Sequence, residues 1–166
     1  HAQIETAKAL AAKGHTTALE AALINALAHR FPSPEVAPLA LLQSSDRAYA
    51  DAMYDAYLAH GSDPDVATLY ADALINLTPW HLWDVRTGAK NPEARTDDVI
   101  NALETALGNG FEGHIGLLHY HIHALEMSPY PELALSSAHT LINRAPRDTG
   151  HLHHMPAHIL FLTGDL

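Results

Sequence analysis

The stretch TALEAALINALAHR at residues 17–30 predicts the kind of secondary structure that the whole chain adopts. Its large apolar residues recur at intervals of three and four, which places them on one face of an α-helix. They are Leu19, Leu23, Ile24 and Leu27. Thr16 or Thr17 can cap the start of this helix, and Pro32 follows its end.

The same pattern of a helix followed by a stop signal continues along the chain. Further helices are expected at 4–13, from Ser45 or Asp46 to Gly61, and at 64–77, 96–107, 113–127, 132–144 and 151–162. Proline-rich or irregular connections are expected at 31–38 and 78–95. Because no segment alternates apolar and polar residues for the length of a strand, we predict an all-α fold of antiparallel helix pairs.

Length and composition predict one folded domain over residues 1–166. The chain has a mass of 18.0 kDa, with 48% hydrophobic and 17% charged residues, so it can bury a core. No apolar run approaches the roughly 18 to 20 residues that a membrane span requires. We therefore expect a soluble protein without a membrane span, with the cytoplasm as the default compartment. Neither the compartment nor the oligomeric state follows from the sequence.

Charge and cysteine content exclude several classes of function. Nine Lys and Arg face nineteen Asp and Glu, which gives a net charge of -10 and argues against a nucleic-acid partner. The lack of cysteine excludes disulfides, thiolate metal sites and a cysteine nucleophile. Histidine is the unusual component, because nine of the fourteen fall between His114 and His158. The chemistry of the protein is therefore expected in this region.

The histidines of this region form two sets at helical spacing. Spacings of three and four return to one face of a helix, so each set points in one direction. The first set is His119, His123 and Glu126, and the second is His151, His154 and His158. His121 and His153 point elsewhere. The isolated histidines are interpreted as ordinary surface or core residues: His1, His15, His29, His60 and His139.

The C-terminal part of the chain resembles a tetratricopeptide repeat. The segments ELALSSAHTLINRAP at 132–146 and LHHMPAHILFLTGDL at 152–166 are similar to the second helix of one repeat and the first helix of the next. Small residues, proline and glycine occupy the positions that the repeat requires: Ala134, Ala138, Ala145, Pro146 and Gly164. First helices of successive repeats are neighbours, so the resemblance implies that both histidine sets face one groove.

A narrower resemblance concerns histidine-bearing bacterial tetratricopeptide-like proteins. The matching residues are His119, Ile122, His123, Glu126, Gly150, His151, Leu152, His154, Met155, Pro156 and His158. This resemblance does not imply any particular activity for the chain. A further second helix should begin at Leu166, where the sequence stops, so we expect a chain that is partial at its C-terminus.

Six side chains meeting in one groove predict a transition-metal site. Imidazoles without sulfur favour copper, iron or zinc over calcium and magnesium, which prefer oxygen. The candidate ligands exceed the needs of one tetrahedral ion, so one or two ions per chain are expected. They are His119, His123, Glu126, His151, His154 and His158. Glu126 is the candidate general base. Pro156 can kink its helix or delay its start, which makes His151 the weakest ligand candidate.

A second group, Trp80, His81, Trp83 and Asp84, lies in the irregular connection. These residues either anchor that loop against the core or form the wall of a substrate pocket, with His81 or Asp84 reaching the metal groove. The sequence is compatible with a metalloenzyme that activates water or dioxygen and takes a small-molecule or peptide ligand. It is also compatible with a metal storage protein, or with a helical-repeat adaptor that binds a peptide or protein partner. In the adaptor, the histidines would be a hydrogen-bonded cluster or a pH-sensitive packing face.

Overall fold

The computed structural model describes residues 1–35 and 38–165 and confirms the all-α prediction. Eight α-helices pack against their neighbours, and the described residues form no β-sheet. An isolated antiparallel bridge between Trp83 and Lys90 is the one extended pairing in this part of the chain. The helices belong to two compact units, His1–Gly61 and Ser62–Leu166. The prediction of one domain over residues 1–166 stays a prediction.

The first unit contains α1 (Ala2–Ala12), α2 (Ala18–Arg30) and α3 (Leu39–His60), and α2 packs against both other helices. The start of α2 is a complete capping box. Thr17 accepts a hydrogen bond from the backbone of Glu20, whose carboxylate in turn accepts one from the backbone of Thr17. The predicted start of α2 is therefore confirmed.

The start of α3 differs from the prediction. Ser45 or Asp46 was expected to cap this helix, but the helix begins at Leu39, directly after Pro38. Ser44 donates its hydroxyl hydrogen to the carbonyl of Leu41 at 2.9 Å, so this serine lies inside the helix and bonds back to the preceding turn. The predicted connection at 31–38 includes residues 36 and 37, which lie outside the described residues.

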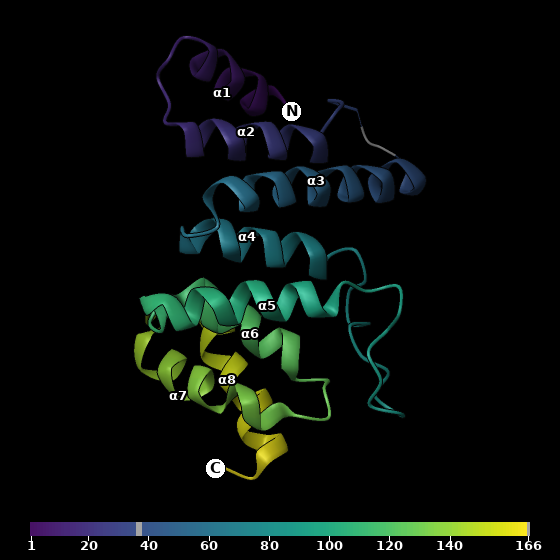
Figure 1. The fold of residues 1–166 in the computed structure, drawn as a ribbon, viewed down its shortest axis with the longest axis vertical. Helices are drawn as coiled ribbons and strands as arrows, with labels where there is room; N and C mark the ends of the chain where they lie inside the picture. The colour runs from purple at the N-terminus through teal and green to yellow at the C-terminus, as the bar shows by residue number, and fades with distance from the viewer. Residues whose placement is uncertain (36–37, 166) are drawn as a thin grey trace. The chain divides into compact units, whose positions relative to one another are not determined.

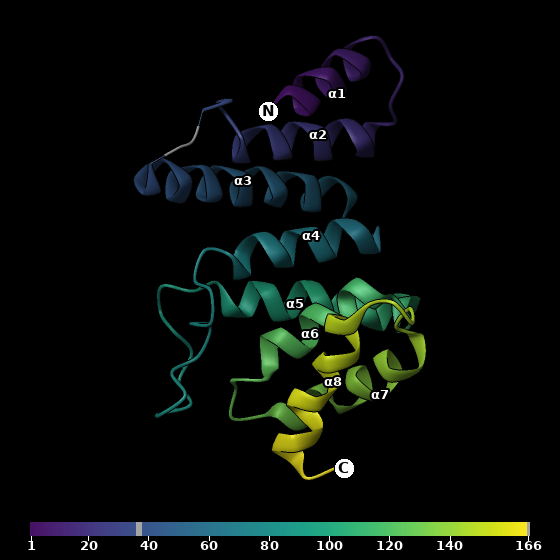
Figure 2. The same ribbon diagram turned by 180° about the vertical axis from the view of Figure 1, so that it is seen from behind.

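The second unit contains the histidine-rich helices. Its α-helices are α4 (Pro64–Ile75), α5 (Thr96–Ala106), α6 (Ile115–Leu125), α7 (Leu135–Arg144) and α8 (Gly150–Thr163). A π-helical turn, Leu107–Phe111, follows α5, and a 3-10 turn, Pro131–Ala134, precedes α7. Helix α6 contacts α4, α5, α7 and α8, so it is the central helix of this unit (Figure 1, Figure 2).

Apolar packing fixes α6, α7 and α8 relative to one another. Leu118 and Ile122 of α6 are buried with Leu141 of α7 and with Met155 and Ile159 of α8. Each of these side chains is at most 2% exposed. Full burial of a side chain of this size contributes about 1.5 to 3 kcal/mol, so this cluster is a firm base for side chains along its edge.

The irregular connection between α4 and α5 is anchored by Trp83. Its indole N–H donates to the carbonyl of Ala124 at 2.8 Å, and the side chain is buried. Ala124 lies in the last turn of α6, where backbone carbonyls lack a helical donor. The loop-anchoring interpretation therefore holds for Trp83.

None of the helices in the described part of the chain is both long and apolar enough to cross a membrane. The expectation that a further second helix should begin at Leu166 concerns a position outside the described residues.

Candidate metal centre

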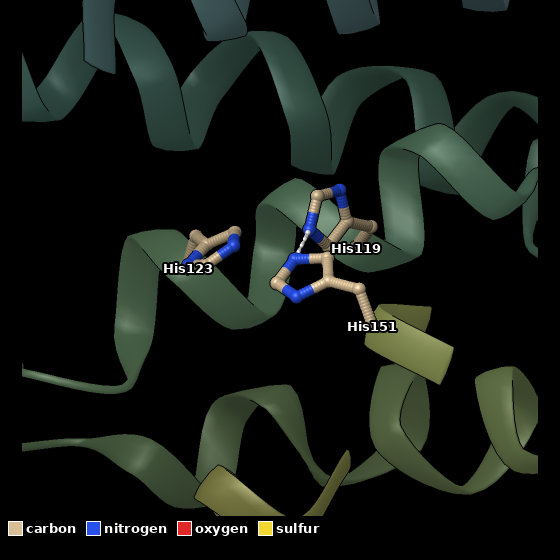
Figure 3. Close-up of side chains that lie close together, drawn as sticks. All are labelled: His119, His123 and His151. Carbon is tan, nitrogen blue, oxygen red and sulfur yellow. Dashed lines mark hydrogen bonds between the residues drawn. The ribbon is translucent and has the colours of Figure 1, made fainter. Parts of the chain in front are cut away.

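Three histidine side chains from two helices converge beside α6. His119 and His123 are one turn apart on α6, with ring centroids 4.6 Å apart. His151 comes from the first turn of α8, and its Nε2 atom lies 3.0 Å from Nε2 of His119. One ring nitrogen from each residue lies within 4.8 Å of the other two (Figure 3). This is a candidate three-histidine metal-binding cluster.

The packing of α6 on α8 explains why these side chains meet. His119 and His123 each follow a buried apolar residue of α6 by one position. His154 and His158 each precede a buried apolar residue of α8 by one position. The histidines therefore lie along the edges of the packed stripe rather than within it. His151 is one turn before Met155, at the exposed start of the same face of α8.

Pro156 does not remove His151 from the site. Helix α8 begins at Gly150 and runs to Thr163 with Pro156 inside it. Of the two expected effects of Pro156, a kink or a later helix start, the later start is therefore wrong, and His151 is one of the three residues of the cluster. Pro156 is buried against the core, and that burial offsets the backbone hydrogen bond that a proline inside a helix lacks.

Glu126 joins the histidines of α6 to those of α8. Its Oε1 atom lies 2.9 Å from Nδ1 of His123, and its Oε2 atom forms a close contact with Nδ1 of His158. In turn, Nε2 of His158 lies 2.7 Å from Nε2 of His154. All six predicted ligands therefore lie in one continuous set of contacts. Of these, His119, His123 and His151 form the compact cluster.

The local environment keeps Glu126 ionised although it is only 9% exposed. Burial by itself would raise the pKa of Glu126. The hydrogen bonds and electrostatic attraction that His123 and His158 provide outweigh burial, so the pKa lies below its ordinary value. A carboxylate at this position accepts hydrogen bonds and donates none.

His119 is held in the form that a metal requires. Burial, reinforced by the neighbouring His123 and His151, lowers the pKa of His119 from 6.5 to about 4. Near neutral pH its imidazole is therefore uncharged and has a nitrogen lone pair available. Metal ions bind this neutral form of histidine.

The spacing of one nitrogen pair in the cluster is close to that of two ligands on one metal ion. Two nitrogens bound to one tetrahedral ion lie about 3.3 Å apart when each metal–nitrogen bond is about 2.05 Å. The 3.0 Å between the His119 and His151 nitrogens is close to this value, and the third nitrogen is within 4.8 Å.

The other histidines of the region have different partners. His121 is buried on another side of α6, with Nδ1 2.8 Å from the hydroxyl of Ser137. His153 points to the carbonyl of Pro146 at 3.1 Å. Both observations confirm that these two residues face away from the cluster. His139 pairs with Asp165 at 2.7 Å, as expected of an isolated surface histidine.

A cavity of about 220 Å³ opens beside His119 and His123. Trp80 and Trp83 line it, whereas His81 and Asp84 do not. Those two residues border an adjoining, more open hollow of about 540 Å³, which both tryptophans also line. His81 is exposed, and a carboxylate oxygen of Asp84 accepts a hydrogen bond within its own loop, from the backbone of Arg86 at 2.9 Å.

Trp80 has an unusual conformation for an exposed residue. It is 62% exposed, and its ring stands edge-on to His123 with centroids 5.9 Å apart. Its φ angle of 62° lies in the left-handed region, where it is the one residue other than glycine among those described. The backbone is therefore strained at the residue whose ring lies beside the cluster.

Three polar residues of the cavity were not found from the sequence. Tyr120 donates its hydroxyl hydrogen to Oδ1 of Asp72 at 2.7 Å, and Asn76 donates to the same oxygen at 2.8 Å. Asp72 lies in the last turn of α4 and Asn76 directly follows that helix, and their spacing of four residues is only a weak signal in the sequence. Nothing in the sequence connects Tyr120 with a residue 48 positions earlier.

Comparison with known protein families finds no match to this chain, and searches of curated proteins and of solved structures find no significant match either.

Proposed function

We propose that the protein binds a transition-metal ion, copper, iron or zinc, through His119, His123 and His151. The observation that carries this proposal is the approach of one ring nitrogen from each residue to within 4.8 Å of the others. The chemistry of the donors supports it, because three imidazoles without sulfur suit these ions. The low pKa of His119 supports it as well, since a histidine must be unprotonated to bind a metal ion.

We further propose that the site is that of an enzyme. Three protein ligands leave a coordination position for water or substrate, which is typical of catalytic rather than structural metal sites. A bound ion would supply Lewis acidity toward water, dioxygen or a substrate oxygen. The cavity of about 220 Å³ beside two of the three histidines has room for a small molecule. Storage of metal without turnover would need no such cavity.

Glu126 is the proposed general base of this enzyme. Its carboxylate is ionised, buried, and lines the cavity together with His119 and His123. It can accept a proton from a group bound in the cavity, while the hydrogen bond of 2.9 Å from His123 holds the carboxylate in place. Trp80 and Trp83 would form the apolar wall that orients the substrate.

The arrangement of α6, α7 and α8 supports the proposal that the fold is a tetratricopeptide-like solenoid. Helix α7 packs against both α6 and α8, and α6 also contacts α8, as a second helix lies between two neighbouring first helices of such repeats. If the fold is such a solenoid, α6 and α8 are first helices of successive repeats, and their histidines face one groove. An adaptor function for that groove remains the alternative.

Metal content tests the proposal directly. Protein purified without an affinity tag and incubated with Zn²⁺ or Cu²⁺ should retain at least one ion per chain after desalting, as measured by mass spectrometry of the elements. His151→Ala should lose that ion, while His153→Ala, on the same helix but facing Pro146, should keep it. Equal metal content in the two variants would contradict the proposal. An adaptor would show no saturable rise in melting temperature with either ion.

A further inference from the structure

We propose that His154 and His158 form a second metal-binding position, and that Glu126 links it to the three-histidine cluster by holding one histidine of each. This inference rests on the proposed function, because it assumes that the three-histidine cluster binds an ion. It assigns separate roles to the six side chains, of which three bind the first ion, two bind the second and one carboxylate positions both groups.

The contacts of Glu126 fix the orientation of two imidazoles. An ionised carboxylate can only accept, so Nδ1 of His123 and Nδ1 of His158 must both carry the hydrogen. A neutral imidazole has one N–H, so the lone pair of each ring is then on Nε2. Glu126 therefore directs the Nε2 atoms of His123 and His158 toward an ion. Carboxylates that hold a histidine ligand from behind in this way are common at metal sites.

The second pair of nitrogens is held together by a hydrogen bond, and an ion bound between them would move the two rings apart to about 3.3 Å. Nε2 of His154 and Nε2 of His158 are 2.7 Å apart, on adjacent turns of α8. His154 is exposed and His158 half-buried, and both border an open hollow of about 520 Å³. An ion can therefore reach the pair from solvent. Two imidazoles leave more coordination positions to water than three do, so this position should bind more weakly.

One ion cannot use all six side chains at once. Among the described residues, His119, His123 and His151 are the one group of three or more potential ligands whose donor atoms all lie within 4.8 Å. His154, His158 and Glu126 do not join that group. Glu126 in particular has both oxygens engaged with Nδ1 atoms. Two positions sharing one carboxylate account for all of these contacts.

Calorimetric titration with Zn²⁺ tests the second position. The wild-type chain should bind two ions in a tighter and a weaker event. His154→Ala should abolish the weaker event and leave the tighter one unchanged, while His153→Ala, an exposed neighbour on α8 that faces the carbonyl of Pro146, should retain both. A second event that survives in His154→Ala would overturn the inference, as would a single event in the wild type.

Glu126→Gln tests the link between the positions. An amide has one acceptor oxygen and cannot accept from both Nδ1–H groups, so both affinities should fall by about 10- to 100-fold. Nitrogen NMR should show His123 and His158 with the hydrogen on Nδ1 in the wild type and a mixture of forms in the variant. A purely structural role would lower the melting temperature without this change of tautomer. Affinities that stay the same would contradict the role of Glu126.

The experiment separates this inference from the proposed function. In His151→Ala the tighter event should disappear or weaken strongly. If the tighter event persists in His151→Ala, the proposed three-histidine site is wrong. If the tighter event is lost in His151→Ala but His154→Ala still binds two ions, as His153→Ala does, only the proposed second position is wrong. Circular dichroism of each variant without metal checks that its helices are intact.

Discussion

His119 is the residue whose charge state the fold changes most clearly. Burial and the neighbouring His123 and His151 lower its pKa to about 4. The unfolded chain takes up a proton at this residue near pH 6.5, whereas the folded chain does so only near pH 4. Protonation between these values favours unfolding, so the contribution of His119 to stability is present above pH 6.5 and is lost as the pH falls toward 4.

The expected result is a melting temperature of the metal-free protein that falls between pH 7 and pH 5. His119→Asn, which stays neutral throughout, should show a shallower fall over the same range. Thermal unfolding followed by circular dichroism in the presence of a chelator measures both slopes. Equal slopes would mean that His119 is not held neutral by its surroundings.

The two tryptophans of the irregular connection should respond to substitution in opposite ways. Trp83→Phe leaves the carbonyl of Ala124 without its donor, which should lower the free energy of unfolding by about 1 to 3 kcal/mol. Trp80→Gly removes a 62% exposed ring and relieves a φ of 62°, so stability should stay the same or rise by about 1 kcal/mol.

Urea unfolding of both variants measures this difference. A loss of stability in Trp80→Gly as large as that in Trp83→Phe would show that Trp80 is also an anchor of the loop. The proposed role of Trp80 as a wall of the substrate cavity would then lose its support.

The packing of α6 against α4 requires a residue without a side chain at Gly116. A Cβ atom at this position would lie 2.7 Å from Cγ2 of Thr68, which is nearly buried. Gly116→Ala should therefore lower stability by about 1 to 3 kcal/mol, despite the gain of about 1 kcal/mol in helix propensity. Gly150, at the start of α8, has open space around it, so Gly150→Ala is the matched control with little or no loss.

A double variant identifies the cause of the loss. Thr68→Ser removes the methyl group that clashes and keeps the hydroxyl that bonds to the carbonyl of Pro64 at 2.7 Å. Gly116→Ala combined with Thr68→Ser should recover at least half of the lost stability in denaturant unfolding. The absence of any recovery would place the effect of Gly116→Ala elsewhere.

Helix boundaries could be predicted where a side chain satisfies the backbone locally. Thr17 caps α2, and α4 begins at residue 64 as predicted, with Asp63 accepting from the backbone of Asp65 and Val66. The start of α3 was wrong because serine serves equally as a cap or as a residue that bonds back within a helix. The expected caps, Ser45 and Asp46, lie inside the helix because the residues from Leu39 onward are already helical, and the local pattern does not show that.

The candidate site could be predicted within each helix but not between helices. Spacings of three and four identified which histidines share a face of α6 and of α8. They could not show that His151 pairs with His119, because that contact depends on how α6 and α8 pack. Nor could they show that Glu126 bonds to Nδ1 of two histidines, since the ring nitrogen used depends on side-chain rotation. The pairing of Tyr120 with Asp72 was missed for the same reason.

At the scale of the whole molecule, all proposed ligands belong to one compact unit, Ser62–Leu166. An ion that binds only the folded state stabilises it by about 2.7 kcal/mol at a free concentration 100 times its dissociation constant. This stabilisation should appear as slower hydrogen exchange in residues 115–125 and 150–163 on addition of Zn²⁺. Uniform slowing over the whole chain, or none, would contradict a site between α6 and α8.

The net charge of -10 suits the binding of a cation. A negative field raises the local concentration of cations and disfavours anions such as nucleic acid. The prediction of no nucleic-acid partner stays a prediction. The net charge does not show whether the protein is an enzyme or a storage protein, or whether it binds one ion or two. Experiments on the histidine cluster must answer both questions.

The most direct test of the account is the position of a bound ion. Crystals grown with Zn²⁺, Cu²⁺ or Fe²⁺ and measured above and below the absorption edge of that metal would show it by anomalous scattering. The account predicts a peak at bonding distance from one nitrogen each of His119, His123 and His151. A peak confined to other residues, or no peak among these three histidines at saturating metal, would contradict it.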